Sequence, residues 1–416
     1  MKFQTQTSDL KYALDIVTLV TPIVATSQGA SGYLFVVKDG KCSIHSRDEQ
    51  RRIRVDLEVS DLEGEGSFVY PADKVAALQY LEGTIEFEAG QTGDRFWVKY
   101  TSDSGARAER STCDPDLLQS IDEDVDQATE GYTLPSAILK EGLQTTKSYI
   151  AKVGDNRVGD QYKTVQLFDA AAKKEWAKGD GCLYASDHIR MIYFMCEAFK
   201  GKGLAIHGQH LPTLMSFLSK CEGEVRIRAG EGVTFLVNSK GSVFGWSQHD
   251  KQHGKYAYYP LKMDGFVLKA AKASLMRTLK LVRAELDPKK DKIRIEYSHE
   301  DKVLRYKSSE TSGQAESNPV PVEPLADEEK GTGQAGLTSD FAGNINIDQM
   351  LDLVADVKAT HVELRASIID RDGRDYILFR TIERFPMSPA GKVLVDKKSD
   401  EEVYLCEVTR FMPSKD

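Results

Sequence analysis

Cysteine is scarce in this sequence, and its spacing excludes two common kinds of site. The six cysteines among 416 residues form no Cys-x-x-Cys pair and are spread over the whole chain: Cys42, Cys113, Cys182, Cys196, Cys221 and Cys406. A chain of this length can bury a core without covalent cross-links, and disulfide frameworks belong mainly to small secreted domains. We therefore expect reduced thiols in a cytoplasmic protein.

Long hydrophobic runs are also missing. The most apolar early stretch, residues 16–25, is interrupted by Thr18, Thr21 and Pro22. It is much shorter than the ~20 residues that a membrane-spanning helix requires. The first residues lack the apolar segment of a signal peptide as well. We expect neither secretion nor a membrane anchor.

The usual catalytic signatures do not occur. The sequence contains no GxxxxGK[ST], GxSxG or HExxH pattern. His207, His210 and Cys221 could in principle ligate zinc, but no fourth ligand stands at an established spacing. The Ser-Asp-His run at residues 186–188 is typical of a turn, because adjacent residues seldom converge on one another. We therefore expect no enzyme, no metal and no cofactor.

Positive charge is in deficit. The chain has 55 Lys and Arg against 64 Asp and Glu, a net charge of −9, and a pI of about 5.6. The field of the whole molecule would repel nucleic acid and anionic membranes. A role with nucleic acid therefore requires a segregated basic face.

Two stretches have the composition of linkers. Residues 114–130 contain seven acids and no base, which predicts a self-repelling, extended connection. Residues 308–340 contain no aromatic residue, three prolines and four glycines. Such a composition cannot bury enough apolar area to order itself, so we predict a flexible insertion there.

A pattern of one short amphipathic helix and two alternating strands occurs three times. The first strands of the copies begin at residues 85, 225 and 362, so the copies are offset by 140 and 137 residues. An earlier helix is predicted in each copy, at residues 8–20, 135–152 and 266–284. We therefore predict three similar α+β domains with boundaries at 1–124, 125–262 and 263–416.

The helix predicted at residues 266–284 carries bases and no acid. Its apolar stripe is followed on the adjoining arc by Lys269, Lys272, Arg277, Lys280 and Arg283. The helix at residues 135–152 is similar but weaker. A solvated helix face explains any one of these segments, whereas acid-poor helices in several domains of an acidic protein favour an anionic partner.

Several segments, taken in order, resemble one family. They are Gly-Tyr-Thr-Leu-Pro at 131–135, Tyr-Ala-Ser-Asp-His-Ile-Arg-Met at 184–191, Gly-Asn-Ile-Asn-Ile at 343–347, Met-Leu-Asp-Leu-Val at 350–354, the strand at 403–408 and Phe-Met-Pro at 411–413. The chain resembles the bacterial-type DNA polymerase III beta sliding clamp, which some bacteriophages also encode. His188 and Ile189 depart from the Gly and His that the family carries in its corresponding turn.

The resemblance implies three repeated clamp domains, each with two helices on antiparallel sheets, and two chains that close head to tail into a ring around duplex DNA. It implies a processivity factor in the cytoplasm of a bacterium or a phage-infected host, tethering DNA polymerase and clamp loader through short linear motifs. The DNA contacts expected are Lys140, Lys147, Lys152, Arg157, Lys220, Lys269, Lys272, Arg277 and Lys280. The partner-peptide pocket expected comprises Asp187, Arg190, Met191, Tyr259, Pro260, Phe411, Met412 and Pro413.

The alternative is a protein that binds DNA without forming a ring. It could be a replication scaffold or a single-strand DNA-binding protein, with Trp97, Trp176 and Trp246 as platforms on which bases stack. Trp97 lies in an alternating strand pattern, which favours packing over base stacking.

Overall fold

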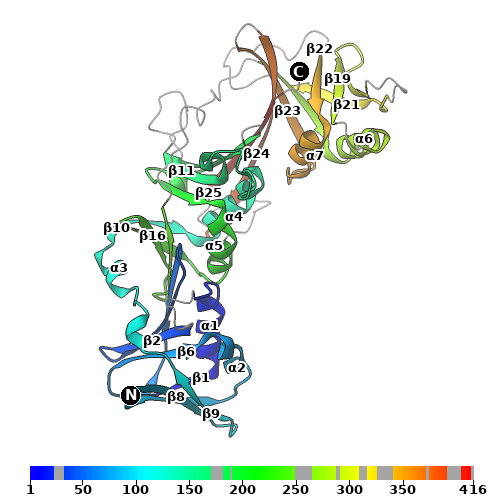
Figure 1. Cartoon of the computed structure of the whole chain (residues 1–416). Helices are drawn as coiled ribbons and strands as arrows, with labels where there is room; N and C mark the ends of the chain where they lie inside the picture. Colours follow the sequence, from blue (N-terminus) through cyan, green and yellow to red (C-terminus); the bar gives the residue numbers. More distant parts are fainter. Residues whose placement is uncertain are drawn as a thin grey trace. The chain divides into compact units, whose positions relative to one another are not determined.

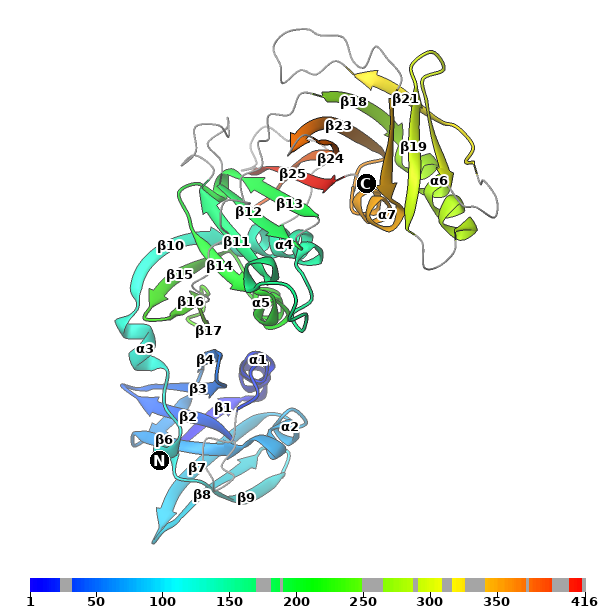
Figure 2. The same cartoon turned by 45° about the horizontal axis from the view of Figure 1, so that its top comes forward.

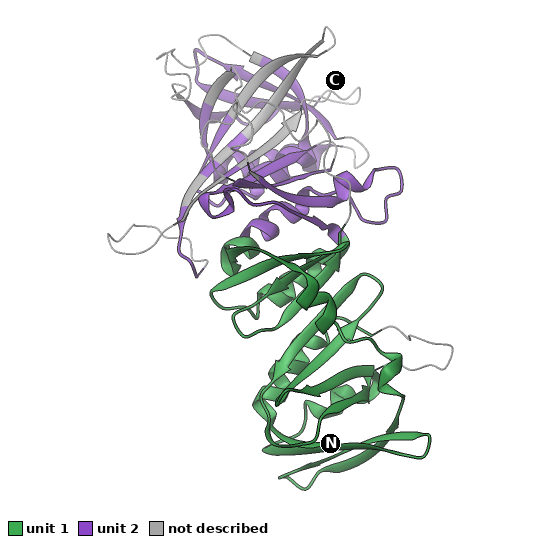
Figure 3. Ribbon diagram, turned by 90° about the vertical axis from the view of Figure 1, so that its left-hand side faces the viewer, with its two compact units in different colours: residues 1–140, 209–250 green, residues 141–208, 251–416 purple. Residues whose placement is uncertain are grey.

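The computed structural model describes the backbone of residues 1–22, 32–169, 181–187, 190–248, 265–286, 291–308, 316–325, 341–371, 374–390 and 404–413. It divides into two compact units, residues 1–140 with 209–250 and residues 141–208 with 251–416 (Figure 3). The first unit holds a five-stranded and an eight-stranded sheet, and the second holds a twelve-stranded sheet. The pairings between the described strands are antiparallel, which confirms the predicted α+β class.

The first repeat of elements runs from β1 to β9 (Figure 1). Its helices are α1 (Thr7–Val17) and α2 (Val75–Leu78), the second preceded by the 3-10 turn η1 (Ala72–Lys74). Its strands are β1 (Lys2–Gln6), β2 (Gly32–Lys38), β3 (Lys41–Arg47), β4 (Arg51–Leu57), β5 (Ser60–Glu63), β6 (Gly66–Pro71), β7 (Thr84–Thr92), β8 (Arg95–Ser102) and β9 (Arg107–Thr112).

The second repeat contains α4 (Ser136–Thr146) and α5 (Leu211–Leu218). Its strands are β10 (Thr129–Pro135), β11 (Thr164–Asp169), β12 (Gly181–Ser186), β13 (Met191–Cys196), β14 (Leu204–His207), β15 (Glu224–Gly230), β16 (Val233–Val237) and β17 (Val243–Ser247). Its 3-10 turns are η3 (Lys147–Tyr149), η4 (Asp160–Lys163), η6 (Glu197–Phe199) and η7 (Gly208–His210).

The third repeat contains α6 (Lys272–Glu285) and α7 (Ile347–Ala355). Its strands are β18 (Gly265–Ala271), β19 (Lys292–Ser298), β20 (Val303–Ser308), β21 (Val320–Leu325), β22 (Phe341–Asn346), β23 (His361–Arg371), β24 (Arg374–Met387) and β25 (Tyr404–Pro413).

One backbone hydrogen bond recurs at the equivalent position of all three repeats. The first residue of α1, α4 and α6 donates its N–H to the residue that precedes the strand after the second helix. The three bonds run from Thr7 to Gly83 at 3.0 Å, from Ser136 to Gly223 at 2.9 Å and from Lys272 to Thr360 at 2.9 Å. The threefold repetition predicted from the spacing of the sequence is thus confirmed at the level of single backbone contacts.

Successive repeats are joined by strand pairing that follows one rule (Figure 2). In the first unit β17, the last strand of the second repeat, pairs with β4, with Val243 opposite Arg54. In the second unit β25, the last strand of the third repeat, pairs with β13, with Phe411 opposite Met191. Both β4 and β13 are the third strand after the first helix of their repeat. The last strand of a repeat therefore extends a sheet of the preceding repeat.

Several predicted helix boundaries were wrong. The helices predicted at 8–20 and 135–152 end earlier, at Val17 and Thr146. Residues 266–271 belong to strand β18, and the helix begins only at Lys272, because Leu268 and Ala270 are buried on one side of the sheet while Lys269 is half exposed. That alternation has the period of a strand. Pro135 likewise ends β10 and does not enter the first turn of α4.

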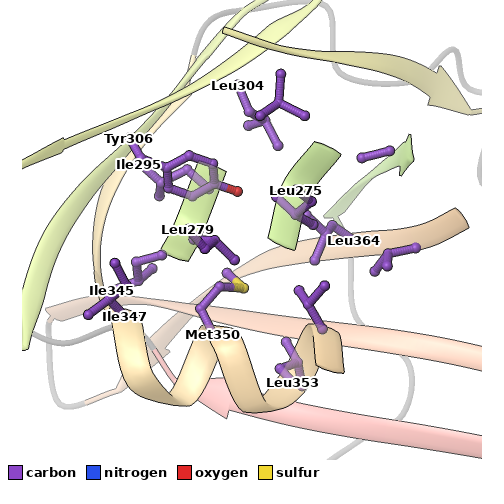
Figure 4. Packing of buried hydrophobic residues seen from close by; sticks show 14 of the residues in the cluster. Leu275, Leu279, Ile295, Leu304, Tyr306, Ile345, Ile347, Met350, Leu353 and Leu364 are labelled. Carbon is purple, nitrogen blue, oxygen red and sulfur yellow. The ribbon is translucent and has the colours of Figure 1, made fainter. Parts of the chain in front are cut away.

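The core of the third repeat lies between its helices and sheets. Figure 4 shows Leu275 and Leu279 of α6 and Met350 and Leu353 of α7 directed into one interior, and each of these side chains is at most 1% exposed. The apolar stripe predicted along α6 is confirmed at these two leucines. Burial of each large apolar side chain is worth about 1.5–3 kcal/mol.

The acidic segment at residues 114–130 is more ordered than predicted. It contains the 3-10 turn η2 (Pro115–Leu117) and helix α3 (Asp122–Gln127). Arginines of β4 bind its carboxylates, with 2.9 Å from Arg54 to Asp122 and 2.9 Å from Arg52 to Asp124. The apolar side of the segment is buried with strands β16 and β17: Ile121, Val125, Ala128, Val233, Phe235 and Val243.

The prediction of a flexible insertion at 308–340 is corrected for its described part. Glu316 forms a bridge with Lys307, and β21 pairs with both β18 and β20. The alternating burial of Val320 and Val322 gives this stretch a core-facing side despite its prolines. Residues 309–315 and 326–340 lie outside the described residues.

His45 holds the acidic segment to the first repeat as a neutral imidazole. Its side chain is 2% exposed, its Nδ1 accepts the N–H of Ile121 at 3.3 Å, and its Nε2 lies 2.7 Å from the hydroxyl of Ser43. Burial lowers the pKa of His45 to about 4; nearby Asp122 opposes this shift and Arg54 adds to it.

Acidification is expected to weaken folding through His45. Between about pH 6.5 and 4 this imidazole is protonated in the unfolded chain and neutral in the folded chain. The free energy of unfolding therefore falls as the pH drops. His45→Gln removes this pH dependence of the free energy of unfolding, which amounts to up to ~1.4 kcal/mol per pH unit. Urea midpoints measured across that window should decline less for His45→Gln than for the parent. His361→Gln, at an exposed histidine of β23, is the matched control. Equal declines in parent and His45→Gln would contradict the assignment.

Candidate nucleic-acid interface and partner-peptide pocket

The cations predicted to meet DNA in the first unit differ in their surroundings. Lys140 is half buried on α4, and no acid binds it among the residues that the structure describes. Lys220, just after α5, is exposed, and its Nζ lies 3.1 Å from Asp15 of α1. Lys220 is therefore partly neutralised by a carboxylate within the same unit.

Three further predicted cations follow α4 in the second unit. Lys147, Lys152 and Arg157 are exposed. Arg157 binds Asp155 at 2.9 Å, and hydrogen bonds from the side chain and backbone of Arg157 lower the pKa of that carboxyl to about 2. No acid binds Lys147 or Lys152 within the described ranges, which leaves their charge available to a phosphate.

The third repeat divides its predicted cations by role. Lys272 donates to the carbonyl oxygens of Ala355 and Val357 at the C-terminal end of α7, where a cation is favoured by the helix dipole. Lys269 lies on β18, 4.0 Å from Glu323. Arg277 and Lys280 are exposed on α6, and among described residues no carboxylate pairs with them.

Arg190, one of the residues predicted for the partner pocket, lies in a cluster of polar contacts. Its Nε donates to Asp187 Oδ2 at 2.9 Å, and the backbone N–H of Arg190 donates to Asp187 Oδ1 at 2.7 Å, which closes the turn between β12 and β13. Its guanidinium also donates to Asp352 of α7 at 2.8 Å and to the carbonyl of Ser148 at 3.1 Å. The guanidinium carbon lies 5.1 Å from the centre of the Tyr149 ring.

The electrostatics of this cluster keep the guanidinium charged. Burial by itself would lower the pKa of Arg190, but the carboxylates of Asp187 and Asp352 outweigh it and the net shift is upward. Burial raises the pKa of Asp352, and Asp356 and Asp348 add to that shift while Arg190 opposes it. Arg190 therefore links the turn of the second repeat to a helix of the third through charge-assisted hydrogen bonds.

The remaining residues predicted for the pocket are only partly described. Met191 is 9% exposed and stands opposite Phe411, so it presents little surface of its own. Met412 and Pro413 continue the same strand, opposite Phe379 and Leu378 of β24. Tyr259 and Pro260 lie outside the described residues. The structure thus brings Asp187, Arg190, Met191 and the backbone of 411–413 to one joint between β13 and β25.

Sequence reasoning missed three members of the Arg190 cluster. Ser148 contributes only a backbone carbonyl, and Tyr149 contributes the face of its ring. Asp352 stands 162 residues from Arg190 along the chain. A carboxylate on a helix next to the predicted pocket was the available signal for Asp352, but no sequence spacing pairs it with Arg190.

The zinc alternative finds no support in the geometry. Within the described residues, no cluster of three or more His, Cys, Asp or Glu side chains is placed to hold a metal. Cys221 donates its thiol to the carbonyl of Phe217 at 3.3 Å, and burial raises its pKa to about 11. A thiol with a raised pKa is a poor metal ligand, because the thiolate is the binding form.

Of the three tryptophans considered as platforms for base stacking, the structure describes Trp97 and Trp246. Trp246 is fully buried on β17. Trp97 lies across the gap left by Gly90, where an added Cβ would approach the ring to 2.9 Å, and its Nε1 donates to Thr92 at 3.2 Å. Trp176 lies outside the described residues. Trp97 therefore lies in a strand, as predicted, but it is half exposed and does not belong to the buried core.

Comparisons with known proteins identify the fold. No protein-family model matches the sequence, and a search of curated proteins found no match. Solved structures match it over its whole length. The DNA polymerase III beta subunit of Pseudomonas aeruginosa has 16% identity and a TM-score of 0.70, with 100% of each chain covered.

Two further matches agree. The beta subunit of Thermotoga maritima has 17% identity and a TM-score of 0.66, covering 100% of this chain and 99% of its own. A sliding clamp of Bartonella birtlesii bound to griselimycin has 16% identity and a TM-score of 0.68, with 100% of both chains covered. Among the described residues, no helix is long and apolar enough to cross a membrane. The three structural matches show that the chain has the fold of the bacterial DNA polymerase III beta subunit, the sliding clamp.

Proposed function

We propose that this protein is a sliding clamp that encircles duplex DNA and tethers a replicative polymerase and its clamp loader. The observation that carries the proposal is the joint rule, by which the last strand of one repeat extends a sheet of the preceding repeat. Head-to-tail contacts of this kind generate a ring where the rotation from one repeat to the next closes.

The rule also predicts a partner strand for the last strand of the first repeat, outside that repeat. β9 is the last strand of the first repeat and forms an end of the five-stranded sheet. By the same rule it would extend a sheet in the third repeat of a second copy, next to β21, the third strand after α6. Two copies would then form two identical seams and a closed homodimeric ring of six domains, with domains at 1–124, 125–262 and 263–416.

A ring holds DNA by topology and requires no catalytic group. Its phosphate contacts can therefore be few, weak and interchangeable, which allows the duplex to slide. The exposed cations Lys147 and Lys152 suit such contacts, because no carboxylate competes for them among the described residues. The net charge of −9 discourages DNA binding elsewhere. We place the protein in the cytoplasm, where the replication machinery works.

Retention on circular DNA tests the ring. The protein, assembled on a nicked circular plasmid by a clamp loader or by reassociation of separated copies, should stay bound after a wash in about 0.5 M salt, which weakens phosphate contacts. Cutting the plasmid once should release it. Retention that ignores the cut and is lost in salt would favour the alternative, a DNA-binding scaffold without a ring.

Lys147 and Lys152 should contribute to the affinity for DNA and not to assembly. The double variant Lys147→Glu, Lys152→Glu should reduce the salt slope of binding to linear duplex by about 2, since each phosphate contact contributes about 0.9. Lys200→Glu, at an exposed site after η6, is the control and should leave the slope unchanged. An unchanged slope in the double variant would remove both lysines from the interface.

Arg190 should position the partner pocket. Arg190→Ala leaves Asp187 and Asp352 without their cation, and binding of a polymerase-derived peptide should weaken about tenfold or more. Asp352→Asn keeps an acceptor for Arg190 and should weaken binding less. Fluorescence anisotropy with the labelled peptide measures both. Arg294→Ala, which removes an exposed pair with Glu296 on β19, is the control. Unaltered affinity in Arg190→Ala would place the pocket elsewhere.

A further inference from the structure

Each joint inside the chain carries one helix-to-helix ion pair of the same polarity. In the first unit Lys220, after α5, binds Asp15 of α1 at 3.1 Å. In the second unit Lys358, after α7, binds Glu141 of α4. In both cases a lysine after the second helix of one repeat meets an acid on the first helix of the preceding repeat.

The equivalent positions in the first repeat can be read from backbone contacts. The second helices close with the same turn, in which Cys221, Val357 and Leu81 donate their N–H to the residue three before. Lys220 precedes this turn residue and Lys358 follows it. The corresponding residues next to Leu81 are Tyr80 and Glu82. The first repeat thus replaces the lysines of the joints with an aromatic residue and an acid.

Both replacements lie on the surface of the first unit. Tyr80 is 84% exposed, which is exceptional for an aromatic side chain. Glu82 is exposed, and no cation binds it among the described residues. Neither side chain has a role in the core of its own repeat, in contrast to Leu81, which is 5% exposed.

The opposite surface is found on α6. Glu141 is the sixth residue of α4 and Asp15 is the ninth of α1. The sixth and ninth residues of α6 are Arg277 and Lys280. Residues three apart share one face of a helix, so these two bases occupy the face that carries the acids in the other repeats. Leu281, next to Lys280, is 50% exposed.

We propose that Tyr80 and Glu82 of one copy bind α6 of a second copy, with Glu82 paired to Arg277 or Lys280 and Tyr80 packed on Leu281 and the Arg277 guanidinium. The proposal rests on the proposed ring and names the side chains of its seam. Tyrosine and arginine are the residue types that most often dominate the energetics of interfaces. A guanidinium over a tyrosine ring adds a cation–π attraction.

The polarity of the seam is the reverse of that in the joints. At the joints the lysine lies on the later repeat, whereas at the seam the acid lies on the first repeat and the bases lie on α6. A first repeat placed against α1 or α4 would bring Glu82 to Asp15 or Glu141, and like charges in contact disfavour that arrangement. The reversal therefore selects α6 as the docking site and gives Arg277 and Lys280 a role other than the DNA contact predicted from sequence.

A charge-exchange experiment tests the seam in the full-length protein. The dimer dissociation constant is measured by analytical ultracentrifugation for the parent, Glu82→Arg, Arg277→Glu and the double variant. Each single variant should raise the constant about tenfold or more, and the double variant should recover most of the loss. Tyr80→Ala should also raise it about tenfold. Asp94→Arg makes the same change of charge at the exposed β7–β8 turn and should have no effect.

The outcomes separate this inference from the ring itself. A parent protein that stays monomeric at all concentrations would overturn the proposed ring and the seam with it. A parent that dimerises while the Glu82 and Arg277 variants dimerise equally well would overturn the seam and leave the ring standing. A double variant no better than the worse single variant would show that the two side chains do not meet. Loss of DNA retention in Arg277→Glu with an unchanged dimer would return Arg277 to the DNA interface.

Discussion

Backbone pairing between repeats is the constraint on which the other features depend. An edge strand has unsatisfied N–H and C=O groups along its length, and a protein must cover or pair them. In this chain β4 and β13 satisfy theirs by accepting the last strand of the next repeat. Because strand pairing fixes register and direction together, each joint also fixes where the helices and turns of adjacent repeats meet. Asp15 meets Lys220, and Asp352 meets Arg190, as consequences of that register.

Among the described residues, the third repeat pairs most of its bases within the fold. Most described cations of the third repeat bind acids or carbonyl groups, as Arg283 binds Asp348 at 2.7 Å and Lys272 binds the end of α7. The segregated basic face available to the proposed clamp is therefore small among the described residues. It depends on which bases lack an acid in the folded chain, and counting bases along a helix overestimates it.

The sequence predicts the repetition and the apolar stripe of α6 because both are local periodic signals. The sequence fails where a strand is followed directly by a helix. Lys269 fits the exposed arc of a helix and the exposed side of a strand equally well, and only the pairing of β18 with β21 and β23 shows that it belongs to a strand. It fails again for the acidic segment, whose compensating Arg52 and Arg54 stand about seventy residues earlier. Arg190 was found from the resemblance, whereas its pairing with Asp352 depends on tertiary contact.

Strand pairing and ion pairs contribute differently to the joints between repeats. Lys220 and Asp15 are 41% and 50% exposed, and a pair so accessible to water contributes at most about 1 kcal/mol. The ladder and the buried side chains beside it must therefore supply the stability of a joint. The strand pairing, however, follows the same rule at both joints of the chain and cannot by itself tell one repeat from another. The ion pairs have the same polarity at both joints and are reversed only at the proposed seam, so weak exposed pairs can favour one order of repeats even though they add little to stability.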